Sequence, residues 1–205
     1  MSWLMRLMVG LAIGSMAAPA LAQLANDGDR FISFLRDGEK SAALALLESK
    51  PIIIDATDSR GETALLVSVK GRDAAWTAHL IKSGANPNIA ARNGETPLIA
   101  AARIGFTDAV RWLIGAGAKV DATNKRGETP LIVAVQERHV SLVRLLLSAG
   151  ADPDRTDSAA GFSARDYAKR ETRFPDLLAA INASNVRGKP ETKPASGKLD
   201  DFKLN

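Results

Sequence analysis

Residues that could catalyse a reaction or bind a metal are scarce in this sequence. It has no cysteine and only two histidines, His79 and His139, which excludes thiol nucleophiles, disulfides and cysteine-based zinc sites. The two histidines fall two units apart in the repeat described below, and stacked helices would separate them by roughly 16–20 Å. Two ligands of one zinc ion must each lie about 2 Å from the metal. We therefore expect no zinc site, and we interpret His79 as a partly packed helix residue.

Two other patterns are similar to ligand-binding loops but lack essential residues. Asp152, Asp154 and Asp157 have the spacing of a calcium loop, which needs glycine at its sixth position and glutamate at its twelfth. Those positions hold Asp157 and Ser163. The segment Gly115-Ala116-Gly117 is similar to part of a dinucleotide-binding loop, but it follows a helical pattern and no third glycine follows it, so it predicts the end of a helix. We expect no catalytic, cofactor-binding or metal-binding residues, and hence no enzyme.

The first 22 residues have the three parts of a cleavable export signal. Arg6 supplies the positive charge, residues 7–16 are apolar, and Ala20-Leu21-Ala22 is a cleavage motif that predicts a mature chain from Gln23. The apolar run is about half of the roughly 20 residues that a membrane-spanning helix needs. We expect no stable membrane insertion after cleavage, and a mature formal charge of +3 because Arg6 is lost. Export without disulfides favours the bacterial periplasm.

Two markers repeat in phase along the middle of the chain. The tripeptide Gly-Glu-Thr begins at Gly61, Gly94 and Gly127, which are 33 residues apart. The dipeptide Gly-Ala recurs with the same period, at residues 84, 117 and 150. Such a period is typical of a repeat solenoid.

Each unit predicts two helices followed by a polar turn. In the unit from Asn124, Thr129 can cap a short buried helix that has Pro130 at its first position. Apolar residues between Val140 and Leu147 lie on one face of a second helix, which Gly150 ends. The linking segments are rich in Asp, Asn and Gly, as hairpin-like turns are.

At this point the sequence resembles the ankyrin-repeat family. Thr-Pro-Leu-Ile at residues 96–99 and 129–132 resembles its Thr-Pro-Leu-His motif, and residues 150–154 resemble its Gly-Ala-Asp turn. Leu66, Ile99 and Ile132 stand where the motif has histidine, so we expect packing in place of its hydrogen bonds. The resemblance implies an all-α ankyrin-repeat solenoid over residues 23–184, before a disordered polar tail at 185–205. About five helix-turn-helix units are expected: 26–57, 58–90, 91–123, 124–156 and 157–184.

The resemblance also implies a concave face, made by turn tips and first helices, that contacts a protein partner. Cations and anions alternate along it, which suits a protein of mixed charge. DNA is not expected, because its phosphates would meet Glu62, Glu95 and Glu128 in a row. The candidate contact residues are Arg60, Glu62, Lys70, Arg92, Asn93, Glu95, Arg103, Lys125, Arg126, Glu128 and Gln136.

The function expected from these observations is non-catalytic recognition. The main hypothesis is a monomeric periplasmic adaptor or accessory protein that needs no cofactor and binds a protein partner. Two alternatives stay open. One is an envelope-associated structural protein that uses its basic tail, and the other is an enzyme with an unrecognised site in the groove.

Overall fold

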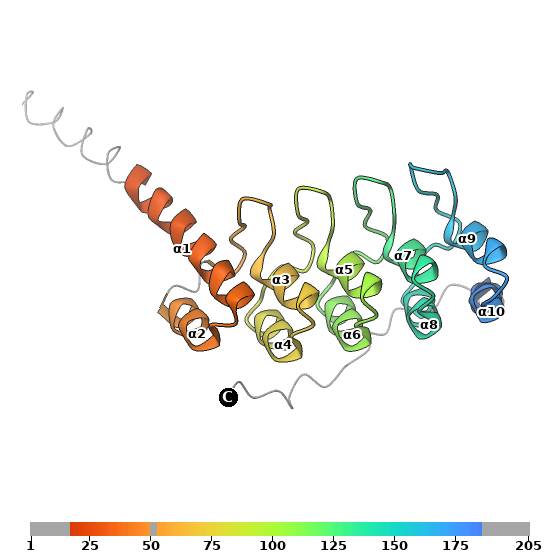
Figure 1. Cartoon of the computed structure of the whole chain (residues 1–205), viewed down its shortest axis with the longest axis horizontal. Helices are drawn as coiled ribbons and strands as arrows, with labels where there is room; N and C mark the ends of the chain where they lie inside the picture. The colour runs from red at the N-terminus through yellow and green to blue at the C-terminus, as the bar shows by residue number, and fades with distance from the viewer. Residues whose placement is uncertain (1–16, 50–52, 186–205) are drawn as a thin grey trace, which may run out of the picture.

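The fold is a row of helix pairs, seen in a computed structural model that describes residues 17–49 and 53–185 (Figure 1). Most of the predicted export signal and nearly all of the predicted tail lie outside these residues. Helix α1 begins at Ala17, so it contains the predicted cleavage position before Gln23. The helices are α1 (Ala17–Asp37), α2 (Lys40–Ser49), α3 (Ala64–Lys70), α4 (Ala74–Lys82), α5 (Pro97–Arg103), α6 (Thr107–Gly115), α7 (Pro130–Gln136), α8 (Val140–Ser148), α9 (Ala164–Arg170) and α10 (Pro175–Asn185).

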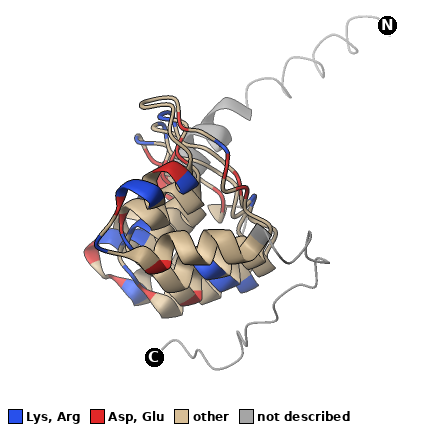
Figure 2. Ribbon diagram, turned by 90° about the vertical axis from the view of Figure 1, so that its right-hand side faces the viewer, with Lys and Arg blue, Asp and Glu red and all other residues tan. Residues whose placement is uncertain are grey.

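The pairs stack side by side in two helical layers. The first helices form one layer, in which α3 packs against α1 and α5, and α7 packs against α5 and α9. The second helices form the other layer through contacts of α4 with α6, α6 with α8 and α8 with α10. Hairpins link successive pairs, lie one behind another along the stack and project away from the helices (Figure 2). The prediction of an all-α solenoid is confirmed.

The core consists mainly of the first helices, which are too short to support themselves. Helix α5 has seven residues, of which the first six, Pro97 to Ala102, are buried. A helix that is apolar on every side is stable only inside a protein. Leu66, Ile99 and Ile132, which replace the motif's histidine, are 0% exposed, so packing does take the place of a polar side chain there.

Threonine side chains begin the three central first helices. The side-chain oxygen of Thr129 accepts a hydrogen bond of 3.2 Å from the Ile132 N–H, and Pro130 follows as the first helical residue. Thr63 and Thr96 make the same bond. Loss of such a cap costs about 1 kcal/mol. The predicted role of Thr129 and Pro130 is confirmed.

Backbone hydrogen bonds join each hairpin to the next. The Arg92 N–H donates to the Arg60 carbonyl at 2.9 Å, the Lys125 N–H donates to the Asn93 carbonyl at 3.0 Å, and the Ser158 N–H donates to the Arg126 carbonyl at 2.8 Å. These bonds fix how far one hairpin can slide past its neighbour. They hold the hairpin side chains in a regular row.

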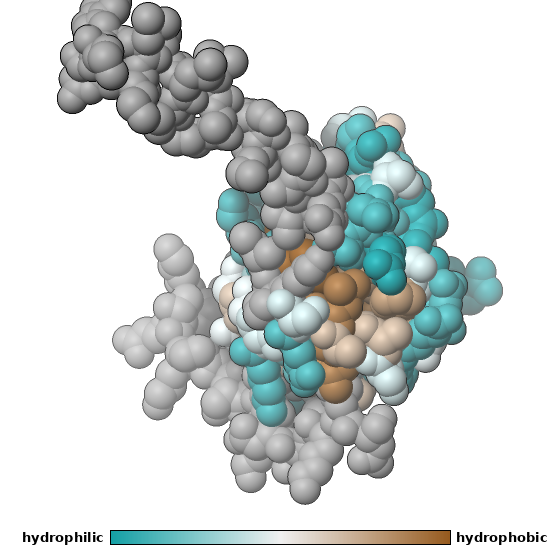
Figure 3. Space-filling view, turned by 90° about the vertical axis from the view of Figure 1, so that its left-hand side faces the viewer, coloured by the Kyte–Doolittle hydropathy of each residue, from teal (hydrophilic) through white to brown (hydrophobic). Residues whose placement is uncertain are grey.

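The two ends of the stack differ from its middle. Hydrophobic residues reach the surface at the N-terminal end (Figure 3), and the large ones of the first unit that stay partly exposed are Phe34, Leu35, Leu44, Leu46 and Ile54. In the last unit, Ser163 and Asp166 form a capping box at the start of α9, and the Arg170 guanidinium lies 3.6 Å from the centre of the Phe162 ring.

No helix among the described residues has both the length and the apolar character needed to cross a membrane.

The hairpin contacts predict that two glycines with the same backbone conformation differ in their tolerance of alanine. Gly94 and Gly117 both have a positive φ, of 81° and 86°. A Cβ at Gly94 would lie 2.7 Å from the backbone nitrogen of Lys125, whereas a Cβ at Gly117 would meet nothing within 4 Å. Gly117→Ala should lower the free energy of unfolding by about 1–2 kcal/mol through backbone strain alone. Gly94→Ala should lower it further, as measured by urea denaturation, and equal losses would contradict the stacking contact.

Candidate partner-binding face

A groove runs along the first helices, and three hollows lie in it from one end of the stack toward the other, the first two of them bordered by a hairpin. The first, of about 440 Å³, is lined by Leu35, Arg36, Arg60, Glu62, Val67, Lys70 and Gly71. The second, of about 350 Å³, is lined by Asn93, Glu95, Arg103, Asn124, Lys125 and Arg126. The third, of about 250 Å³, is lined by Val135, Gln136, Tyr167, Arg170 and Glu171.

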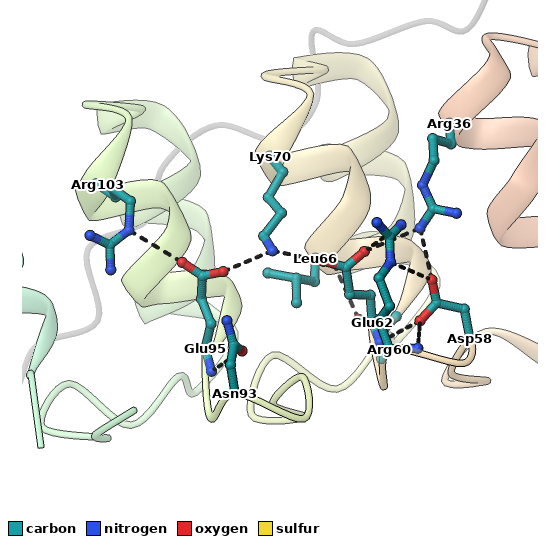
Figure 4. Close-up of polar contacts among 10 residues, drawn as sticks. Arg36, Asp58, Arg60, Glu62, Leu66, Lys70, Asn93, Glu95 and Arg103 are labelled. Carbon is teal, nitrogen blue, oxygen red and sulfur yellow. Dashed lines mark hydrogen bonds and ion pairs between the residues drawn. The ribbon is translucent and has the colours of Figure 1, made fainter. Parts of the chain in front are cut away.

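The floor of the groove carries a continuous series of ion pairs that crosses the repeat boundaries (Figure 4). Glu62 accepts from Arg36 at 3.1 Å and from Lys70 at 2.7 Å. The Lys70 ammonium also lies 2.8 Å from Glu95, which contacts Arg103 at 3.3 Å. We call this series the ion-pair ladder, and it comprises Arg36, Glu62, Lys70, Glu95, Arg103 and Glu128.

The ladder ends where the sequence changes. Arg103 lies 3.7 Å from Glu128, and Arg126 in the adjacent hairpin lies 2.8 Å from the same carboxylate. The next helix ends in Gln136, which cannot supply a cation at the position held by Lys70 and Arg103. One repeat further on, the Tyr167 hydroxyl donates to Asp157 at 2.6 Å.

The carboxylates and the cations of this face lie at different depths. The side chains of Glu62, Glu95 and Glu128 are 10%, 11% and 8% exposed. Those of Arg60 and Arg126, which contact them, are 57% and 61% exposed. The glutamates therefore lie at the bottom of the groove, and the arginines lie above them at the surface.

The ladder changes the ionisation of its members. Burial tends to raise the pKa of Glu95, but hydrogen bonds and charge from Lys70 and Arg103 outweigh burial and lower it below its ordinary value. Burial tends to lower the pKa of Lys70, yet its bonds to Glu62 and Glu95 raise it. Both groups are therefore charged at neutral pH.

Side chains within each hairpin hold the tip in shape. The Asp58 carboxylate accepts hydrogen bonds from the N–H groups of Arg60 and Glu62 at 2.8 and 2.9 Å. Asn124 does the same for Arg126 and Glu128 at 2.9 and 3.1 Å. Burial tends to raise the pKa of Asp58, but these bonds and the Arg36 guanidinium lower it to about 2.

The structure brings most of the predicted contact residues together in the groove. Nine of the eleven line a hollow: Arg60, Glu62, Lys70, Asn93, Glu95, Arg103, Lys125, Arg126 and Gln136. Arg92 lies exposed on its hairpin, and Glu128 is buried beneath Arg126. Cations cover Glu62, Glu95 and Glu128. The expectation that DNA phosphates would meet these glutamates directly was therefore wrong, because the glutamates are not accessible.

Sequence reasoning missed several residues of the face. Arg36 comes from α1, whose unit lacks the repeat markers, although its place near the end of a first helix is also that of Lys70 and Arg103. Asp58 and Asn124 share a hairpin register, and that shared position was the signal that could have found them.

The residues considered for metal binding have structural partners. Asp154 pairs with Arg165 at 2.6 Å, and Asp157 accepts from three backbone N–H groups. Among the described residues, no three acidic or histidine side chains are placed to share a metal ion. His79 contacts Trp76 edge-on. His139 lies at the N-cap of α8, not inside the helix, and its Nε2 lies 3.3 Å from the Arg103 carbonyl oxygen.

Stacked helix pairs, threonine caps and projecting hairpins agree with a match of residues 73–157 to a family described as ankyrin repeats (3 copies). The chain contains ankyrin repeats. Ankyrin repeats are protein–protein interaction modules and are generally not catalytic. The matched residues contain every residue that lines the second hollow.

The low pKa of Asp58 predicts a specific loss of stability in acid. A carboxylate whose pKa falls from 3.8 to about 2 on folding contributes stability that is complete above pH 3.8 and is lost as the pH falls toward 2. Asp58→Asn should keep the hairpin, as Asn124 does, and lose this contribution. We expect about 1 kcal/mol, less than the full shift implies, because Arg36 is 39% exposed and water screens the pair.

The measurement is urea denaturation of both proteins at several pH values. The difference in unfolding free energy between wild type and Asp58→Asn should shrink between pH 4 and pH 2, values that bracket the change in pKa. A difference that stays constant over this range would contradict the ion-pair contribution.

Proposed function

We propose that this ankyrin-repeat protein is an exported, non-catalytic adaptor or accessory protein of the periplasm that binds a protein partner along the groove. The observation that carries the proposal is the regular succession of hollows on neighbouring repeats, each lined by polar side chains of the first helices and, in the first two, of a hairpin as well. A surface that repeats in this way can contact an extended length of a partner. The partner-contacting residues are those of the candidate list together with Arg36.

The groove is built before a partner arrives. Backbone hydrogen bonds at 2.8–3.0 Å align the hairpins, and the ion-pair ladder restrains the long side chains of Lys70 and Arg103. Ordering a flexible side chain on binding costs about 0.5–1.5 kcal/mol. Much of that cost is removed when folding has already ordered the side chain, which favours a recognition surface.

The absence of cysteine from the sequence allows a direct test by site-specific crosslinking. Ser59 is exposed at a hairpin tip and Ser141 is exposed on α8 in the second-helix layer. Ser59→Cys and Ser141→Cys, each labelled with a photoactivatable maleimide, would place the same probe on the two faces. Crosslinking in a periplasmic extract of the source bacterium should give a discrete protein adduct from position 59.

The matched label at position 141 is the control. It should give no such adduct, or a much weaker one, because α8 lies away from the groove. Adducts of the same protein in equal yield from both positions, or from position 141 alone, would overturn the assignment of the groove as the binding face.

The export part of the proposal has its own test. The chain expressed with residues 1–22 should be recovered from the periplasmic fraction with Gln23 as its N-terminal residue, as read by N-terminal sequencing. A variant without residues 1–22 should stay in the cytoplasm. Recovery of the uncleaved chain from the cytoplasm in both cases would contradict export.

A further inference from the structure

We propose that the groove recognises an acidic protein segment in an extended conformation, whose carboxylates contact a row of cations on the hairpin tips. This inference depends on the proposed function, since it assumes that the groove binds a protein, and it adds the chemistry of the partner. It replaces the mixed-charge surface that the sequence alone predicts.

The first argument is the depth of the charges. The glutamate side chains of the floor are at most 11% exposed, while Arg60 and Arg126 above them are 57% and 61% exposed. An approaching partner therefore meets guanidinium groups before it meets carboxylates. Complementary charge on the partner would be negative.

The second argument is a pair of cations with no partner of their own. Arg92 and Lys125 are exposed on successive hairpins, and neither forms an ion pair with any residue that the structure describes. Their backbone N–H groups donate to the carbonyls of Arg60 and Asn93, so their hairpins are held in register. The backbone of both residues is thus held in place, and their exposed side chains can reach an external carboxylate.

The third argument concerns how dense the positive charge is. The face carries seven cations: Arg36, Arg60, Lys70, Arg92, Arg103, Lys125 and Arg126. The carboxylates that contact them are Asp58, Glu62, Glu95, Glu128 and, at 44% exposure, Glu137. The excess of positive charge is small, although it lies outermost.

A small excess suits a protein better than a nucleic acid. Double-stranded DNA presents one negative charge per about 1.7 Å of its axis. Successive repeats lie about 8–10 Å apart, the usual spacing of packed helices, and each offers one or two outer cations. The row therefore matches carboxylates that are widely spaced.

The spacing also sets the pattern that the segment should have. An extended chain in the polyproline II conformation has three residues per turn and advances about 3.1 Å per residue, so every third side chain recurs on the same face at about 9 Å. A segment that runs along the stack with an acidic residue at every third position would place one carboxylate opposite each hairpin. The hollows between hairpins would accommodate the intervening residues.

The test uses synthetic fluorescent peptides and fluorescence anisotropy with the full mature chain. The probe has four Glu-Ser-Gly units, a length of about 37 Å that covers four repeats. A peptide with Gln in place of Glu is the uncharged control, and an oligothymidylate of the same formal charge represents nucleic acid. The Glu peptide should bind, the Gln peptide should not, and raising the salt from about 50 to 300 mM should weaken the binding.

Charge-reversal variants then locate the binding. Arg92→Glu/Lys125→Glu should weaken binding of the Glu peptide at least about tenfold. The control is Arg111→Glu/Arg144→Glu, which changes the net charge equally at two exposed positions on α6 and α8 and should change affinity less than about twofold. Arg92→Gln/Lys125→Gln should give an intermediate loss, and circular dichroism should show all three variants folded.

Three results would overturn the inference. They are failure of the Glu peptide to bind, equal losses in the two Glu double variants, and tighter binding of the oligothymidylate than of the Glu peptide. The crosslinking experiment separates this inference from the proposed function. If Arg92→Glu/Lys125→Glu still gives the adduct from position 59, the groove binds its protein partner without using these charges, and only the acidic chemistry is wrong.

Discussion

The lateral packing of the first helices is the interaction on which every other feature of this protein depends. Helices of seven residues are far shorter than the about 12–15 that an isolated helix needs to be even marginally stable in water. They form here because α3, α5 and α7 each have a neighbour on both sides and are buried up to their last residue. The hairpins, the groove and the charged row all take their positions from this layer.

The same packing explains why an apolar residue can stand where the ankyrin motif has histidine. Leu66, Ile99 and Ile132 are fully buried, and the N–H of each is satisfied by the threonine three residues earlier. The beginning of the helix therefore keeps its hydrogen bond without the histidine. His139, from a different position, fills the space above Gly105 and approaches the Arg103 carbonyl oxygen, so it also joins neighbouring repeats.

The ion-pair ladder is a consequence of repetition. A glutamate follows the hairpin glycine in three successive units, and a cation stands at or near the end of α1, α3 and α5. Stacking therefore brings Glu62 and Glu95 each between cations of two successive first helices. Pairing of a half-buried carboxylate avoids the cost of leaving a charge without a partner. It also covers the negative charge and leaves positive charge outside, which changes what the surface can bind.

Much of this protein could be predicted from the sequence because its signals are local. The period, the threonine and proline at the start of each short helix, the glycine after each second helix and the apolar faces depend on residues within one unit, and they identify the fold and most of the groove. The depth of each charge could not be predicted in this way. Glu95 is buried because Lys70, from the preceding repeat, lies over it, and Glu62 is paired with Arg36 from a helix that lacks the repeat markers. Such contacts exist only after the repeats have stacked. The sequence by itself determined most of the residues that share the face, whereas the tertiary structure alone decided that the anions of the face are covered and that Arg60 and Arg126 lie outside them.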